Sequence, residues 1–250
     1  MDKIKTYHRI YRICPRMYKG WMNKIPKNLV NTVPNSPKKK KCLSEKEVKA
    51  LLNGHITIEE KIDGGVLGIA WNGNKPLIIG KHSMVNYNVS SKRFYGLTEW
   101  IYKNYESISN IPLHTIVYGE WMRASHNILY NKLPDYFISF DVYNGNENTF
   151  LNVTDRSIFL NEIKFKEVPT IYSGTDLSVE DIICIVEGIE EVSNKSKFNH
   201  NETIEGIIIR NDNSLIGKYV RREFMNSIEE HWLKAPLVEN KLFTEVSQEI

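Results

Sequence analysis

The sequence predicts an α+β fold built from antiparallel sheets flanked by helices. Strand-like and helix-like segments are mixed along the chain without the regular βαβ alternation of a doubly wound fold. Three apolar or alternating segments follow one another between His55 and Ile79, separated only by Gly64-Gly65 and Asn72-Gly73-Asn74. Such close spacing, with glycine and asparagine between the segments, is typical of strands in one antiparallel sheet.

The first 54 residues differ in composition from the rest, and we expect them to form a basic arm and a short helix. Prolines precede the run Lys38–Lys41, which predicts an extended surface segment. The lysines are either a solvated linker or a contact for a phosphate backbone. The stretch Leu43–Leu52 predicts a helix, because Ser44 and Glu47 have the spacing of a capping box. Residues 55–240 would then form the main domain, and residues 241–250 a C-terminal tail.

The remaining elements follow from the period of the apolar residues. Helices are expected at Thr98–Tyr105, Asp155–Ile163 and Ser178–Val192. Strands are expected at Ile56–Ile62, Val66–Trp71, Leu77–Ile79, Thr115–Tyr118, Tyr136–Tyr143, Thr203–Arg210 and Leu215–Arg221. The last two of these segments form an apparent hairpin across Asn211-Asp212-Asn213.

Composition sets limits on the kind of protein. The chain has 250 residues, of which 41% are hydrophobic and 25% charged, with a formal net charge of +3. These values are ordinary for a globular protein, and the mild excess of positive charge permits a polyanionic partner without requiring one. No stretch approaches the ~20 apolar residues of a membrane span, and the charged N-terminus does not resemble a signal peptide. We therefore expect a soluble protein.

The cysteines indicate the compartment. Cys14, Cys42 and Cys184 are few, odd in number and widely spaced, so we expect neither a disulfide framework nor a Cys-x-x-Cys metal clip. No pair of Cys or His residues has the spacing of zinc ligands. A reducing, cytoplasmic location is favoured, and the abundance of Asn, Ile and Lys would suit an AT-rich genome, such as that of a virus or phage.

The strongest chemical signal is Lys61-Ile62-Asp63-Gly64, where a lysine at a strand end is followed by an acid and two glycines. A lysine acts as a nucleophile when part of it is deprotonated, and adjacent glycines let a phosphate approach the backbone. A turn after a strand explains the Asp-Gly pair equally well. Taken alone, the segment is therefore a weak indication.

Four later segments place charged groups beside apolar strands. The acids Glu120 and Glu205 border two of these strands, Phe140 and Asp141 lie within a third, and Lys218 lies in a fourth that ends in basic residues. Each has a structural explanation, as a turn acid or a core aromatic residue. Their order along the chain, rather than any single residue, carries the functional interpretation.

In this order and at these spacings, the five segments resemble the motifs of the covalent nucleotidyltransferases, which include ATP-dependent DNA and RNA ligases and mRNA capping enzymes. The segments are KIDG, YGE, FISFD, EGIIIR and GKYVRR. The longer stretches YGEWM, LPDYFISFDVY and KYVRREF, with Glu230-His231-Trp232 and Ala235–Val238 after them, are most similar to the compact RNA ligase branch. The resemblance covers about residues 55 to 240. It implies an ATP-grasp-like catalytic core.

The resemblance also implies roles for individual residues. Lys61 would attack the α-phosphorus of ATP and carry AMP, which then passes to a 5′-phosphate end before a 3′-hydroxyl displaces it. Glu205 would hold Mg²⁺, with Mn²⁺ as an alternative, and Lys218 would contact the α-phosphate. Among the remaining nucleotide contacts, Glu120 would bind the ribose and Phe140 would stack on adenine with Asp141 beside it. The Glu60 region would meet the edge of the base. Asp63 and Gly64 complete the first motif.

Two departures from the family pattern leave assignments open. Members often carry a basic residue shortly after the first motif, and Lys81 is the candidate here. The fifth motif of nick-sealing RNA ligases has two lysines separated by one residue, whereas this chain has Val220 in the second position. Arg221 or Arg222 would have to replace that cation. His126 lies near the YGE segment in the sequence. It would either contact the substrate or be a surface residue.

Only 32 residues follow Lys218 (250 − 218), too few for the oligonucleotide-binding barrel of replicative DNA ligases and capping enzymes. We therefore expect a catalytic core without a C-terminal OB domain, acting as a monomer on RNA ends or a nicked duplex, with no membrane or obligate protein partner. The arm, with Arg9, Arg12, Arg16 and Trp21, would add phosphate and stacking contacts. The alternatives are a DNA ligase, a GTP-using capping-type guanylyltransferase and a non-catalytic nucleic-acid-binding relative.

Overall fold

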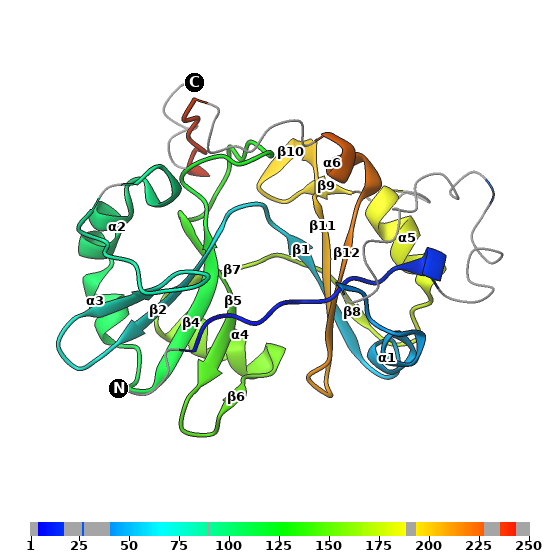
Figure 1. The fold of residues 1–250 in the computed structure, drawn as a ribbon, viewed down its shortest axis with the longest axis horizontal. Coiled ribbons are helices and arrows are strands. Elements are labelled where there is room, and N and C mark those ends of the chain that lie inside the picture. The colour runs from blue at the N-terminus through cyan, green and yellow to red at the C-terminus, as the bar shows by residue number, and fades with distance from the viewer. Residues whose placement is uncertain are drawn as a thin grey trace. The chain divides into compact units, whose positions relative to one another are not determined.

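The computed structural model describes residues 5–17, 27, 41–89, 91–188, 194–227 and 236–243 (Figure 1). Within these ranges the fold is α+β with antiparallel sheets, as the sequence predicts. The chain forms two compact units. The first comprises Met1–His8, Asp63–Val168 and His231–Ile250, and the second comprises Arg9–Ile62 and Pro169–Glu230. The expected domain boundaries at residues 54 and 240 stay predictions.

The second unit is built on a four-stranded sheet in the order β12-β11-β1-β8. All three pairings are antiparallel, and in the register Lys61 lies opposite Gly206 while Ile208 lies opposite Lys218. The strands are β1 (Ile56–Lys61), β8 (Thr170–Gly174), β11 (Gly206–Asn211) and β12 (Ile216–Val220); a small pair, β9 (Lys195–Ser196) and β10 (Asn199–Thr203), accompanies them.

One face of this sheet is the core of the second unit. Its side chains meet α1 (Glu45–Leu51) and α5 (Val179–Glu187), which both lie beside the sheet (Figure 1). The helix α1 begins with the expected capping box of Ser44 and Glu47. The buried residues of this core include Ile56, Ile58, Ile207, Ile209 and Tyr219 from the strands and Val48, Leu51, Ile182, Ile183 and Val186 from the helices.

The first unit contains a larger sheet in the order β3-β2-β4-β5-β6, with β7 paired to β5. Helices cover it with a core that includes Trp100, Trp121 and Phe137. The strands are β2 (Gly65–Trp71), β3 (Pro76–Ile79), β4 (Thr115–Trp121), β5 (Phe137–Asn144), β6 (Thr149–Phe150) and β7 (Lys166–Glu167), and the helices are α2 (Leu97–Lys103), α3 (Tyr105–Ser109) and α4 (Val153–Glu162).

Two short 3-10 helices and one last α-helix complete the described elements. They are η1 (Pro15–Met17), η4 (Lys92–Phe94) and α6 (Arg222–Ser227). None of the helices in the described ranges has both the length and the apolar character needed to cross a membrane.

The structure corrects the expectation that the three successive strands after His55 share one sheet. β1 pairs with β8 and β11, whereas β2 pairs with β3 and β4 in the other unit. Alternation and turn residues identify a strand, but they carry no information about its partner. The grouping was therefore wrong although each strand is present.

The helix expected at Ser178–Val192 ends earlier than the pattern suggests. α5 stops at Glu187, because Gly188 adopts a left-handed conformation with φ of 69° and caps the helix. Residues 189–193 lie outside the described residues. The N-terminal cap at Ser178, with Asp181 in the third position, is a capping box that the apolar pattern did not reveal.

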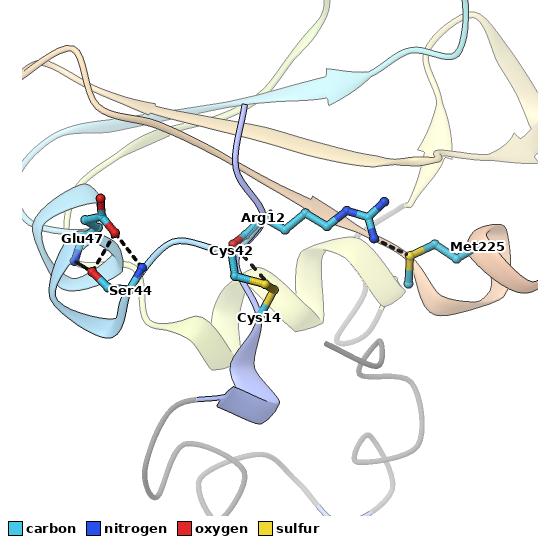
Figure 2. The surroundings of a disulfide bond; sticks show 6 residues. All are labelled: Arg12, Cys14, Cys42, Ser44, Glu47 and Met225. Carbon is cyan, nitrogen blue, oxygen red and sulfur yellow. Dashed lines mark hydrogen bonds between the residues drawn. A yellow bond between two sulfur atoms is a disulfide. The ribbon is translucent and has the colours of Figure 1, made fainter. Parts of the chain in front are cut away.

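The cysteines also differ from expectation. The structure joins Cys14 to Cys42 in a disulfide, with their Cα atoms 6.1 Å apart (Figure 2). The two cysteines meet because Arg12 pairs with Cys42 in a short parallel bridge. Sequence spacing of 28 residues does not reveal such a pairing. The cysteine pattern therefore misled the expectation of no disulfide, and the compartment inferred from it stays a prediction.

Candidate active site

The nucleophile candidate Lys61 is the last residue of β1, and its neighbour across the ladder is Gly206. Glu205 immediately precedes that glycine, so its carboxylate lies beside the lysine. The distance from Lys61 Nζ to Glu205 Oε2 is 2.6 Å, and Glu205 is buried. A buried carboxylate next to an amine can hold the amine in place and accept its hydrogen bond.

Lys218 lies on the same face of the sheet as Lys61. Lys218 pairs with Ile208, which pairs in turn with Glu59, two residues before Lys61. Because side chains two apart in a strand share a face, these residues form one surface, which we call the Lys61 face. The opposite face is the apolar core.

The electrostatics of the Lys61 face favour an anionic ligand. The pKa of Lys218 is lowered to about 8, chiefly by burial and then by the charges of Lys61, Arg12 and Arg9, while Glu205 opposes the shift. Three cationic groups therefore act on the Lys218 ammonium, and the Glu205 carboxylate only partly offsets them. An anion bound there would relieve the repulsion among the cations.

The structure separates the two arginines expected to replace the missing cation of the fifth motif. Arg221 follows β12 and is buried, with Nη2 2.5 Å from Glu223 Oε2 and Nε 3.9 Å from Glu187 Oε2. Glu187 belongs to α5, which packs on the core side. Arg222 begins α6. Arg221 is therefore directed to the core side of the sheet and not to the Lys61 face.

Glu60 is also separated from Lys61, because adjacent residues of a strand point to opposite faces. Its carboxylate accepts hydrogen bonds from Ser196 Oγ at 2.6 Å and from the backbone N–H of Lys197 at 3.0 Å. Burial raises the pKa of Glu60, and these hydrogen bonds oppose that shift. The side chain thus holds the β9 region to β1.

The rest of the first motif anchors the chain after Lys61. The Asp63 carboxylate accepts hydrogen bonds from the backbone N–H of Asn127 at 2.8 Å and from its side-chain amide at 2.9 Å. His126 Nδ1 lies 4.0 Å from the same carboxylate, and the His126 side chain is 7% exposed. His126 is therefore close to the first motif rather than at the surface.

Gly64 is confined by its surroundings. A Cβ at this position would lie 2.6 Å from Met122 Sδ and 2.8 Å from the carbonyl oxygen of Trp121. Because the second neighbour is backbone, a side chain at position 64 would have to displace the strand. The glycine of the motif is therefore needed for close packing of the chain.

Replacing Gly64 with alanine is expected to lower the free energy of unfolding by about 1–3 kcal/mol, because the added methyl overpacks this contact. Urea unfolding followed by circular dichroism measures the change. Gly65→Ala is the matched control, since its added Cβ would find no heavy atom closer than 3.8 Å. Equal stability of the two variants would contradict the steric argument.

Glu120, Phe140 and Asp141 lie on neighbouring strands of the first unit. Glu120 is on β4, opposite Ile138 of β5 and Val66 of β2. The register of β5 shifts between its pairings with Tyr118 and Gly119, which leaves Phe140 as the extra residue of a β-bulge. Bulges redirect side chains and are common next to active sites.

The bulge is supported by Arg156, which the sequence did not indicate. This arginine of α4 is only 1% exposed, and its Nη1 donates to the carbonyl oxygen of Phe140 at 2.6 Å. Its Nε pairs with Glu167 of β7. The hydrogen bond satisfies a bulged carbonyl, and the ion pair fixes the arginine that makes it.

Tyr7 is a second residue that sequence reasoning missed. Its hydroxyl donates to Asp141 Oδ2 at 2.5 Å, and its ring lies edge-on to Phe140 with centroids 4.9 Å apart. No local pattern near Tyr7 indicates a contact with Asp141, which is 134 positions away in the chain. Tyr7 restrains both the aromatic ring and the acid of the FISFD segment.

The structure describes only some of the other expected residues. Lys81 is exposed in the turn after β3. Of the basic arm, Arg9, Arg12, Arg16 and Lys41 are described, whereas Trp21 and residues 38–40 lie outside the described residues. The segment Glu230-His231-Trp232 and Ala235 also lie outside them, and Val238 accepts a hydrogen bond from the backbone N–H of Ser125.

Glu205 is the acid best placed for a divalent metal on the Lys61 face. No group of three or more His, Cys, Asp or Glu residues that could hold a metal occurs in the part of the chain that the structure describes. Mg²⁺ and Mn²⁺ in phosphoryl transfer need few protein ligands, since phosphates and water complete their coordination. A single buried carboxylate beside Lys61 is compatible with that requirement.

Comparison with known proteins adds an independent observation. A family model described as RNA ligase matches residues 54–234. No curated protein sequence matches significantly. The match to the family covers every one of the five motif segments.

Solved structures of a Naegleria gruberi RNA ligase share the fold. A lysine-to-alanine variant with ATP and Mn has a TM-score of 0.59 at 15% identity, covering 72% of this chain and 54% of that one. The form with PPi has a TM-score of 0.57 at 15% identity, covering 72% and 53%. A glutamate-to-alanine variant with AMP and Mn has a TM-score of 0.58 at 14% identity, covering 89% and 57%. The chain thus spans about half the length of these structures.

Proposed function

The chain belongs to the RNA ligase family, and we propose that it is an ATP-dependent ligase that joins a 5′-phosphate end of a polynucleotide to the 3′-hydroxyl of RNA. The observation that carries the proposal is the Lys61 amine, which lies 2.6 Å from the Glu205 carboxylate on a face that also presents Lys218. The arrangement combines a nucleophile, an acid and a phosphate-binding cation within one sheet.

In the first step, the deprotonated Lys61 amine attacks the α-phosphorus of ATP. A phosphorus–nitrogen bond forms, the bond between the α-phosphorus and its bridging oxygen breaks, and pyrophosphate leaves with the electron pair. Glu205 holds the amine in position, and Lys218 neutralises negative charge on the α-phosphate. A divalent metal at Glu205, when bound, supplies further neutralisation of the phosphates.

In the next two steps, the 5′-phosphate of the polynucleotide attacks the phosphorus of lysyl-AMP and releases Lys61. The 3′-hydroxyl then attacks the activated end, a phosphodiester forms and AMP leaves. The resemblance to the family supports ribose contacts from Glu120 and stacking of adenine on Phe140, with Asp141 beside it.

The test is the sealing of a labelled, 5′-phosphate nick with ATP and Mg²⁺, read on a denaturing gel. We expect sealing when the 3′-hydroxyl strand is RNA. Equal sealing of an all-DNA nick would assign the protein to DNA joining, and transfer of GMP rather than AMP to Lys61 would indicate a guanylyltransferase. Absence of any covalent nucleotide on the protein would overturn the proposal.

The affinity for a nucleotide is expected to fall above about pH 8, because Lys218 loses its proton there. Below its pKa the ammonium group attracts phosphate, and by pH 9.5 only a few per cent of Lys218 in the unliganded protein remains charged. The dissociation constant of α,β-methylene ATP, measured by calorimetry, should rise about 10- to 30-fold from pH 7 to 9.5.

Lys218→Arg provides the control for this pH dependence, since an arginine stays charged throughout the range. We expect its dissociation constant to change less than about threefold between the same pH values. A wild-type affinity that does not change with pH would contradict the placement of the phosphates at Lys218.

A further inference from the structure

Residues 11–13 of the N-terminal segment form an additional parallel pairing with β12. The backbone N–H of Ile13 donates to the Lys218 carbonyl at 2.8 Å, and that of Lys218 donates to the Tyr11 carbonyl at 3.0 Å. On the other side, the backbone N–H of Arg12 donates to the Lys41 carbonyl at 3.0 Å. The Arg12 carbonyl accepts from the backbone N–H of Leu43 at 2.9 Å. Arg12 is therefore fixed by backbone hydrogen bonds on both sides.

This pairing directs Arg12 to the Lys61 face. Arg12 and Lys218 are bridge partners, and the side chains of bridge partners lie on the same face of a sheet. Ile13 points instead into the core, where it is 2% exposed. The side chains of residues 12 and 13 thus point to opposite faces of the sheet, as successive side chains do in β12.

The guanidinium of Arg12 is held by a weak acceptor. Its Nη1 lies 3.0 Å from Met225 Sδ of α6, and Figure 2 shows the side chain extending toward Met225 and away from the disulfide. Among the described residues no carboxylate pairs with Arg12. The guanidinium has five N–H donors, and a thioether sulfur is a weak acceptor that engages one of them. Most of the donors are therefore available to a stronger acceptor.

We propose that Arg12 binds a phosphate of the nucleotide beside the one that Lys218 contacts, and so supplies the second cation that Val220 cannot provide in the fifth motif. The inference rests on the proposed function. The planar guanidinium binds phosphate through two parallel hydrogen bonds, which suits the β-phosphate that leaves as part of pyrophosphate. Arg12 would then contribute to the first step and not to the joining of ends that already carry AMP.

The test compares the two half-reactions in the full-length protein. We expect Arg12→Ala to lower the rate of lysyl-AMP formation at subsaturating ATP at least about tenfold, as for loss of a charged hydrogen bond. Joining of chemically adenylylated 5′ ends without ATP should change less than about threefold. Arg12→Lys should recover part of the first step, since a point charge replaces the fork.

Lys49→Ala is the matched control. It removes the same charge from an exposed position on α1, where Lys49 pairs with Glu45 at the surface. Its lysyl-AMP formation should equal that of the wild type. The urea midpoints of unfolding are measured for Arg12→Ala and Arg12→Lys. A midpoint equal to that of the wild type shows that the variant folds, so that a lower rate reports a loss of binding.

Direct binding of inorganic pyrophosphate, measured by calorimetry, separates this inference from the proposed function. Weaker binding to Arg12→Ala than to Lys49→Ala would support the phosphate site even if the wild type formed no lysyl-AMP. Equal loss in both half-reactions would assign Arg12 to the polynucleotide end or to folding. Unchanged pyrophosphate binding in Arg12→Ala would overturn the inference.

Discussion

Lys61→Ala is expected to abolish the transfer of labelled AMP from ATP to the protein, a loss of at least about 10⁴-fold in rate. Lys61 is the expected acceptor because its amine lies 2.6 Å from the buried Glu205 carboxylate, and alanine removes that amine. The measurement is the radioactivity that stays with the protein on a denaturing gel after incubation with α-labelled ATP.

Two further variants make this result interpretable. Lys61→Arg keeps a cation beside Glu205, so its fold is retained, but it should be equally inactive because guanidinium is not a nucleophile. Lys75→Ala removes an exposed lysine in the turn between β2 and β3 and should retain full labelling. Labelled Lys61→Ala protein would exclude Lys61 as the acceptor.

Arg156→Ala is expected to lower the free energy of unfolding by about 3–5 kcal/mol. The substitution leaves the Phe140 carbonyl without this hydrogen bond and removes the cation that pairs with Glu167. The expected readout is a lower urea midpoint at an unchanged slope. Weaker nucleotide binding should accompany it, because the bulge that positions Phe140 loses its support.

Asn161→Ala is the control for this prediction, since Asn161 is an exposed residue on the same helix. Its free energy of unfolding should stay within about 0.5 kcal/mol of the wild type. If Arg156→Ala were equally stable, the buried arginine would have no structural role in the bulge.

Local signals in the sequence were sufficient to predict many of the elements. The capping box at Ser44 and Glu47 and the Asn72-Gly73-Asn74 turn each depend on residues close together in the chain, and the structure contains both. The motif order likewise placed Lys61, Glu205 and Lys218 in one group, and the structure brings these three to neighbouring strands of one sheet.

The positions of residues that depend on distant partners could not be predicted, even for Arg12, which was expected to contact phosphate. Tyr7, Arg12 and Arg156 gain their positions from Asp141, Lys218 and Glu167, and nothing in their local sequence specifies those contacts. The disulfide was missed for the same reason, because Cys14 and Cys42 approach through a pairing between two irregular segments.

The pairing of β1 has a consequence for the order in which the chain folds. β1 is complete at Lys61, but its partners β8 and β11 begin only at Thr170 and Gly206. At a synthesis rate of about 5–20 residues per second, the strand waits roughly 7–30 s on the ribosome for both neighbours. During that interval both edges of β1 lack these partners, whereas β2, β3 and β4 can pair much earlier.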